Sequence, residues 1–354
     1  MRAVVYHGRR DVRVEDVSER SVGPGDVRVD VAACGICGSD LHEYAEGPIT
    51  IPTDEPHHAS GERAPLVVGH EFAGRVREVG ETVEEFAPGD PVTVCPGTAC
   101  GECRYCADGQ YALCDRFVAF GLHSRGGMAE SVVVPKSTVV PLPEGLPVAD
   151  AALVEPLAVS LHAVRRSAFE PGDSAAVFGA GPIGLGVVQV LLEGGASEVF
   201  VSEPRAGRRE VAESLGATVV DPSSERVLRA VKGATGGGVD VSFEAAGVEP
   251  SFVDAVRATK KRGNVTVVSV FEGSVSFQPN LLMMAERTLT GAFCYEAGPK
   301  ARTGEFGAVI RMLADGRLQA DPLVSDRVPI EEAPEAFEAL LDPRGELVKV
   351  LVEP

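Results

Sequence analysis

The stretch Ser174-Ala-Ala-Val-Phe-Gly179-Ala-Gly181-Pro182-Ile183-Gly184 joins a short apolar run to three glycines spaced Gly-x-Gly-x-x-Gly. The apolar run predicts a buried strand and residues 182–192 predict a helix, so the glycines occupy the turn between them. There the first glycine permits a tight turn, the second lets a pyrophosphate approach the backbone, and the third lets the helix pack on the strand. The stretch therefore predicts a dinucleotide site at a helix N-terminus. The alternative is a turn that serves packing alone.

Glu203 ends the next predicted strand, 19 residues after Gly184. A carboxylate at this place accepts hydrogen bonds from the ribose hydroxyls and repels a 2′-phosphate, so it favours NAD over NADP. Arg208 follows between Arg205 and Arg209, and we count it among the candidate cofactor-binding residues. Two roles are open for these arginines: they partly neutralise Glu203, or they form a solvated helix face.

Around this turn the chain alternates strands with helices, which indicates a parallel sheet built by right-handed crossovers. The other predicted strands of this region are 198–202, 218–220, 239–244 and 265–270, and its second predicted helix is 205–215. The first 150 residues are instead short strands and turns, which predict a β-rich, barrel-like domain. After about residue 290 the alternation ends, and we expect one helix, 336–341, and a closing strand, 347–352.

Length and charge exclude several classes of protein. With 354 residues the chain suggests about two domains. Its net charge of -19 provides no basic face for nucleic acid, and no apolar run approaches the ~18 residues of a membrane span. The N-terminus lacks the apolar run of a signal peptide, so we expect a cytoplasmic protein. Such acidity is typical of a salt-adapted protein, and an ordinary acidic cytosolic protein is the alternative.

Five of the eight cysteines lie between Cys95 and Cys114. A chain of this size without an export signal is expected to keep its thiols reduced, so metal sites are favoured over disulfides. Four closely spaced thiolates provide the closed tetrahedral set of a structural zinc, and Cys95 falls outside their spacing. Free buried cysteines are the alternative. The predicted ligands are Cys100, Cys103, Cys106 and Cys114.

A second, dispersed set comprises Cys37, His70, Glu71 and Glu155. One thiolate, one imidazole and a carboxylate would hold a catalytic zinc and leave one coordination position open. Spacing alone is weak support, because a single histidine is often a packing residue and Glu155 could cap a helix.

These motifs together resemble the zinc-dependent medium-chain dehydrogenases. The resemblance spans nearly the whole chain and rests on Gly35-x-Cys37-Gly-Ser39-Asp-x-His42, Gly69-His70-Glu71, the four-cysteine lobe, Glu155-Pro156 and the dinucleotide turn. It implies an α/β protein with a GroES-like, β-rich catalytic domain and a Rossmann domain with a doubly wound parallel sheet. The implied boundaries are 1–154 plus 291–354 for the catalytic domain and 155–290 for the NAD-binding domain.

Within this family the chain most resembles the (R,R)-2,3-butanediol dehydrogenases, in the branch shared with sorbitol and threonine dehydrogenases. The resemblance implies hydride transfer between a secondary alcohol, such as a vicinal diol, and NAD, with one catalytic and one structural zinc. Ser39 would accept the alcohol proton and pass it through a ribose hydroxyl of the cofactor to His42, and Glu71 and Glu155 would exchange as zinc ligand in this branch. A homodimer or homotetramer without nucleic-acid or membrane partners is implied.

Other interpretations stay open. A polyol, L-threonine or sugar dehydrogenase would use the same machinery, whereas a quinone reductase-like dinucleotide binder or a zinc sensor would not need all of it. Ser39 could be a turn residue and His42 a surface helix residue. We expect Asp40 to orient its neighbours, and His57 and His58 to be loop residues near the substrate entrance.

Overall fold

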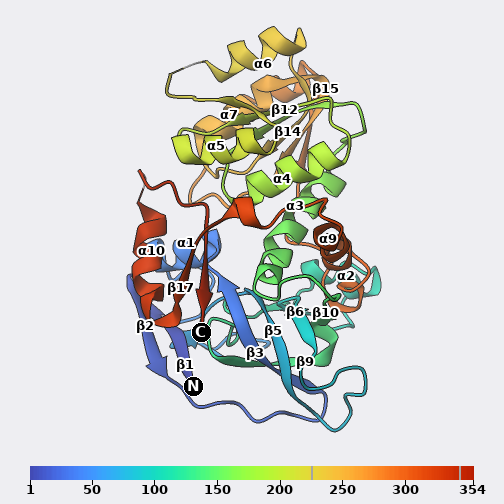
Figure 1. The fold of residues 1–354 in the computed structure, drawn as a ribbon. Coiled ribbons are helices and arrows are strands. Elements are labelled where there is room, and N and C mark those ends of the chain that lie inside the picture. Colours follow the sequence, from blue (N-terminus) through green and yellow to red (C-terminus); the bar gives the residue numbers. More distant parts are fainter. Residues whose placement is uncertain (225, 343) are drawn as a thin grey trace.

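The computed structural model describes residues 1–224, 226–342 and 344–354. Two parts lie one above the other in Figure 1: a β-rich part below, drawn mainly in blue, cyan and red, and a parallel-sheet part above, drawn in yellow-green to orange. Helix α3 (Val154–Arg166) lies between them and packs on α4 (Pro182–Glu193) and α9 (Glu305–Ala314). Its buried residues belong to a core that continues into both parts.

The β-rich part is organised around a seven-stranded sheet in the order β10-β6-β5-β3-β18-β17, with β9 also paired to β3. Its strands are β3 (Asp26–Gly35), β5 (Glu71–Val79), β6 (Pro91–Val94), β9 (Ser131–Pro135), β10 (Val139–Pro141), β17 (Val324–Pro329) and β18 (Lys349–Glu353). A three-stranded sheet and a two-stranded sheet complete it, with β1 (Arg2–Gly8), β2 (Asp11–Asp16), β4 (Leu66–Val67), β7 (Gly97–Thr98) and β8 (Val118–Ala119). The helices here are α1 (Gly38–Glu46), α2 (Arg104–Ala107) and α10 (Ala333–Leu341).

Strand β3 brings together residues from opposite ends of the chain. It pairs antiparallel with β5 through Gly35 and Glu71, and with β18 through Gly35 and Leu351. Its buried, valine-rich pattern is that of a central strand with neighbours on both sides. The beginning of β5 and the beginning of β18 therefore lie close to one another, and this pairing positions the site described below.

The parallel-sheet part has six strands in the order β13-β12-β11-β14-β15-β16, all parallel. The strands are β11 (Ser174–Phe178), β12 (Glu198–Ser202), β13 (Thr218–Val220), β14 (Val239–Glu244), β15 (Thr259–Val267) and β16 (Thr288–Gly291). Besides α4, its helices are α5 (Ala206–Ser214), α6 (Val227–Thr235), α7 (Glu249–Ala258) and α8 (Asn280–Met283). The predicted fold class is confirmed. The strand order reverses between β11 and β14, where ligands bind in sheets of this kind.

Strand β15 and helix α9 are among the elements that differ from the sequence prediction. Strand β15 starts at Thr259 rather than at residue 265, because a bulge around the positive-φ residue Arg262 lets the charged segment 260–263 protrude within the strand. The helix α9 was not predicted, although Phe306, Val309 and Ile310 form its buried face. Within the described residues, no helix has both the length and the apolar composition needed to cross a membrane.

Candidate functional site

Cys37, His70 and Glu71 meet in the β-rich part, where one ligand atom of each lies within 4.8 Å of the others. Cys37 is the N-cap of α1, and its backbone N–H donates to Asp40 Oδ2 at 2.9 Å. The other two residues stand at the start of β5, with His70 and Glu71 both buried.

Asp40 lies behind His70, with Oδ1 at 3.5 Å from Nδ1. Among the described residues, neither of these two buried atoms has another hydrogen-bond partner. Burial opposes the charged imidazole, but the charges of Asp40 and Cys37 outweigh it and raise the pKa of His70 well above its usual value. A carboxylate on one ring nitrogen leaves the other free for a metal, the arrangement typical of metal-binding histidines. The surroundings of this imidazole therefore fit a cation.

The carboxylate of Glu71 is held by a buried lysine. Lys349 Nζ lies 2.7 Å from Glu71 Oε1 and 2.6 Å from Oε2, and it also donates to Ile36 O at 2.7 Å. Both side chains are 1% exposed. Burial lowers the pKa of Lys349, but the Glu71 charge more than offsets this and leaves the pKa raised. Sequence reasoning missed Lys349, and its signal was a single cation inside the apolar run 347–352.

Glu155 stands in the first turn of α3 and is also buried. Burial raises its pKa to about 7, and the nearby His70 and the hydroxyl of Tyr295 act against this rise. Unlike Glu71, it has no ion-pair partner among the residues that the structure describes. Glu155 does not belong to the group whose ligand atoms lie within 4.8 Å of one another, but its carboxylate is close enough to His70 to interact with a cation placed beside that imidazole.

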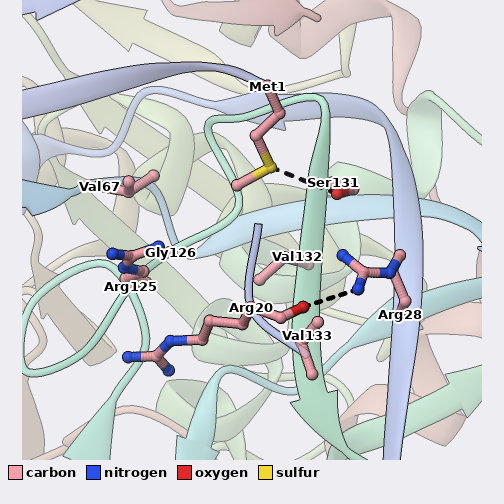
Figure 2. Close-up of a pocket in the computed structure, with 9 residues that line it drawn as sticks. All are labelled: Met1, Arg20, Arg28, Val67, Arg125, Gly126, Ser131, Val132 and Val133. Atoms are coloured by element: carbon pink, nitrogen blue, oxygen red, sulfur yellow. Dashed lines mark hydrogen bonds between the residues drawn. The ribbon is translucent and has the colours of Figure 1, made fainter. Parts of the chain in front are cut away.

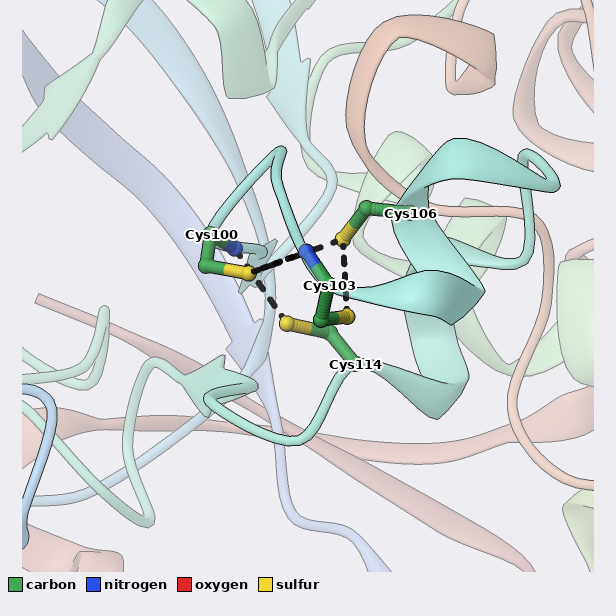
Figure 3. Close-up of side chains that lie close together, drawn as sticks. All are labelled: Cys100, Cys103, Cys106 and Cys114. Carbon is green, nitrogen blue, oxygen red and sulfur yellow. Dashed lines mark hydrogen bonds between the residues drawn. The ribbon is translucent and has the colours of Figure 1, made fainter.

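The four predicted lobe cysteines point toward one another (Figure 3), with all four sulfur atoms within 4.8 Å. The Sγ of Cys106 lies 3.9 Å from that of Cys100 and 3.6 Å from that of Cys103. Tetrahedral zinc with Zn–S bonds of about 2.3 Å requires S–S separations of about 3.8 Å. Backbone N–H groups, first that of Glu102, lower the pKa of Cys100 to about 6. The lobe fits a closed zinc site.

The glycine turn forms an open cradle at the N-terminus of α4. A Cβ on Gly184 would lie 2.0 Å from Gly179 O, so the strand–helix contact needs glycine. A Cβ on Gly181 would instead meet only Arg208 Nη1, at 3.8 Å, which leaves space above the backbone. The first N–H groups of α4 face this space, and they have no carbonyl partner within the helix. The cradle fits a pyrophosphate group.

Glu203 is buried beside this cradle, at the end of β12. Its Oε2 accepts from Ala180 N at 2.8 Å and its Oε1 accepts from Arg205 N at 3.0 Å. Arg208 does not form part of a solvated face: Nε and Nη2 donate to Leu347 O at 3.0 and 2.6 Å. Burial, and then Arg205, lower the pKa of Arg208 to about 10. Arg208 thus joins the rim of the cradle to the segment leading into β18.

The two expected relay residues lie on α1. Ser39 Oγ is 3.3 Å from His70 Nε2, so its hydroxyl borders the candidate metal position. His42, one turn further, is half-exposed, and its Nδ1 is 2.9 Å from Glu272 Oε1 in the parallel-sheet part. His57 stacks on His123, with ring centroids 4.3 Å apart, and His58 Nε2 lies 3.4 Å from Asp115 O.

The matches to known protein families fall on the β-rich part and the parallel-sheet part separately. Residues 23–144 match the alcohol dehydrogenase GroES-like domain, and residues 182–315 match the zinc-binding dehydrogenase model. The chain is 41% identical to the (R,R)-butanediol dehydrogenase of Bacillus subtilis, with 100% of both chains covered. The chain belongs to the zinc-dependent medium-chain dehydrogenases. The resemblance read from its motifs is confirmed.

Two crystal structures resemble this dehydrogenase closely. The 2R,3R-butanediol dehydrogenase of Bacillus subtilis superposes with a TM-score of 0.92 at 40% identity, covering 100% of this chain and 99% of that one. A structure described as a zinc-binding dehydrogenase of Sinorhizobium meliloti bound to NADP superposes with a TM-score of 0.89 at 34% identity, with the same coverage.

A further residue of this dehydrogenase that sequence reasoning missed is Glu43, which is buried in α1. Its carboxylate accepts backbone N–H groups of the segment after α1, from Ile49 at 3.0 Å, Ile51 at 3.1 Å and Thr50. A carboxylate with three backbone donors orders the loop that carries them. Glu43 therefore anchors the segment that follows α1.

A shallow pocket near the N-terminus of the dehydrogenase is lined by other kinds of residue than the cluster around Cys37 (Figure 2). Arg28 Nη2 donates to Arg20 O at 2.6 Å, and Ser131 Oγ donates to Met1 Sδ at 3.3 Å. Its lining lacks the thiol, imidazole and carboxylate groups of the cluster around Cys37. It is therefore not a candidate for the catalytic centre.

Proposed function

We propose that this chain is an NAD-dependent zinc dehydrogenase that interconverts a vicinal diol, such as (R,R)-2,3-butanediol, and the corresponding hydroxyketone. The proposal rests on the thiol of Cys37 and the imidazole of His70, which lie with a carboxylate oxygen of Glu71 within 4.8 Å of one another, beside a second buried carboxylate, Glu155. The diol as substrate is supported by the 41% identity to (R,R)-butanediol dehydrogenase over the full chain.

For the catalytic zinc we propose Cys37, His70 and Glu155 as ligands, with Glu71 held behind them by Lys349. A bound zinc supplies Lewis acidity that makes a substrate hydroxyl easier to deprotonate. Asp40 orients the His70 ring, and Ser39 takes the hydroxyl proton and passes it toward His42 at the edge of the site. The four lobe cysteines would hold the second, structural zinc.

For the cofactor we propose NAD, held by Gly179, Gly181, Pro182, Ile183 and Gly184, with Glu203 on the adenosine ribose. The support is the buried carboxylate of Glu203 beside the Gly181 cradle, where a 2′-phosphate would meet negative charge. Arg208, at the rim of the cradle, points Nη1 toward the place of the pyrophosphate.

Glu203→Ala is expected to raise the KM for NAD by about 10- to 100-fold, because hydrogen bonds to a charged group are lost. The preference for NAD over NADP should fall with it. Steady-state kinetics with both cofactors measure this, and Glu210→Ala, which removes an exposed carboxylate of α5, is the control. An unchanged NAD-to-NADP ratio would assign specificity to other residues.

For domains and assembly we propose a catalytic domain of residues 1–154 and 291–354, a Rossmann domain of residues 155–290, and a homodimer or homotetramer. The edge strand β16 exposes Leu289, which leaves its outer side free for a second copy. All eight cysteines lie within the described residues and none of them forms a disulfide, which supports a cytoplasmic location. Adaptation to high salt rests on the net charge of -19.

The testing experiment measures NADH formation with each stereoisomer of 2,3-butanediol, and with sorbitol, L-threonine and glucose, in low and molar KCl. We expect turnover with the (R,R) isomer at least about tenfold above the other compounds. Preference for sorbitol or threonine would refute the diol as substrate while leaving the zinc chemistry in place. Absence of turnover in a sample with zinc and NAD bound would refute the proposed activity on these compounds.

A further inference from the structure

An ion pair joins the two parts of the molecule at the edge of the candidate site. His42 lies on α1 in the β-rich part, and Glu272 lies in the segment that follows β15 in the parallel-sheet part. His42 Nδ1 is 2.9 Å from Glu272 Oε1, although 230 residues separate them along the chain. The contact exists only because the two parts are held in this relative position.

The other charged groups packed around α1 have partners of their own. On α1 itself, Asp40 accepts the N–H of Cys37, Glu43 accepts three backbone N–H groups, and Glu46 pairs with Arg9. On the facing helix α10, Glu338 binds Arg10 and the hydroxyl of Tyr44. Within the described part of the chain, Glu272 is therefore the carboxylate that contacts His42.

This contact determines which ring nitrogen of His42 can accept a proton. An ionised carboxylate only accepts hydrogen bonds, so the nitrogen facing Glu272 carries the hydrogen. In the neutral ring the other nitrogen, Nε2, then has a free lone pair. Without Glu272 the hydrogen could occupy either nitrogen, and one of the two tautomers would have no acceptor at Nε2.

We propose that Glu272 is a positioning residue for proton release, acting by holding His42 in the Nδ1–H tautomer; this inference rests on the proposed dehydrogenase activity. During oxidation the substrate O–H bond breaks, and Ser39 receives that proton while giving up its own toward His42. A bond forms between Nε2 and the arriving proton, and the resulting imidazolium stands beside the Glu272 carboxylate. Water then takes the proton, while hydride passes to the cofactor.

The first experiment compares Glu272→Ala and Glu272→Gln, with Glu249→Gln as the matched control. The change Glu249→Gln also removes one negative charge. Glu249 contacts the same segment, by accepting from Ser276 N at 2.9 Å, but it does not contact His42. We expect Glu272→Ala to lower kcat for diol oxidation by about tenfold with the KM for NAD unchanged. Glu272→Gln should keep most of the activity, because its amide oxygen still accepts from Nδ1–H.

A His42→Ala background separates positioning from a general structural role. If Glu272 acts through His42, Glu272→Ala should change kcat by less than about twofold in that background. Additive losses in the double variant would overturn the proposal. So would equal kcat values in Glu272→Ala and in the Glu249→Gln control.

The second experiment does not depend on activity. ¹⁵N-histidine NMR of the full-length protein reports the tautomer directly, and the spectrum of His42→Ala assigns the signal. We expect the Nδ1–H tautomer in the wild type and a mixture, or the Nε2–H tautomer, in Glu272→Ala. An Nε2–H tautomer in the wild type would overturn the inference. An Nδ1–H tautomer in a protein that oxidises no alcohol would instead refute the proposed function alone.

Discussion

Replacing Cys37 with serine is expected to lower kcat/KM for diol oxidation by at least about a thousandfold. The hydroxyl of serine is a far weaker zinc ligand than the thiolate at the N-terminus of α1. Losing the metal removes several kcal/mol of charge stabilisation from the transition state, and each 1.36 kcal/mol corresponds to a factor of ten in rate. Zinc content, initial rates and NAD binding by fluorescence measure the effect. NAD affinity should be retained, because the cradle at Gly181 lies in the other part of the molecule.

Cys103→Ser is the matched control, because it removes a thiolate from the lobe rather than from the cluster. It should also lose one zinc per chain and lower the unfolding temperature, while the folded fraction keeps its kcat. The expected contrast is therefore activity lost at position 37 and stability lost at position 103. Full activity in Cys37→Ser would refute a catalytic zinc at this cluster. A loss of kcat in folded Cys103→Ser would argue against a purely structural lobe.

Lys349→Met is expected to cost about 3–5 kcal/mol of folding stability, because it leaves the Glu71 carboxylate buried without its partner. Both oxygens of Glu71 contact the lysine nitrogen, and each side chain is 1% exposed. Water cannot replace the lost ammonium at such burial. Thermal unfolding with bound zinc held constant measures the loss, which should lower the unfolding temperature by roughly 10 °C.

Two companion variants make this result specific to the buried pair. Lys260→Met removes a half-exposed lysine that pairs with Asp240 on the surface, and it should cost less than about 1 kcal/mol. In the double variant Lys349→Met with Glu71→Gln, the buried charge is gone, so most of the stability should return. If the double variant is as unstable as Lys349→Met alone, the loss comes from packing rather than from the charge of Glu71.

Two of the features that sequence alone predicted each lie within a short span of chain. The lobe cysteines lie within 15 residues, and the three glycines of the cradle within six, so local spacing is enough to bring their groups together. The position of Glu203 beside the cradle was predictable for the same reason, because only strand β12 lies between it and α4 in the chain. The alternation of strands and helices gave the parallel sheet for a related reason: each crossover joins neighbouring elements.

The tertiary structure decided what depends on residues far apart in the chain. Glu71 and Lys349 meet because β3 has β5 on one side and β18 on the other, and no local pattern states which strands will be neighbours. The same holds for His42 and Glu272, which contact each other across the two parts. Sequence named the candidate ligands, since their chemistry is a property of each side chain. Which carboxylate is free for a cation, and which ring nitrogen can take a proton, depends on neighbours that only folding supplies.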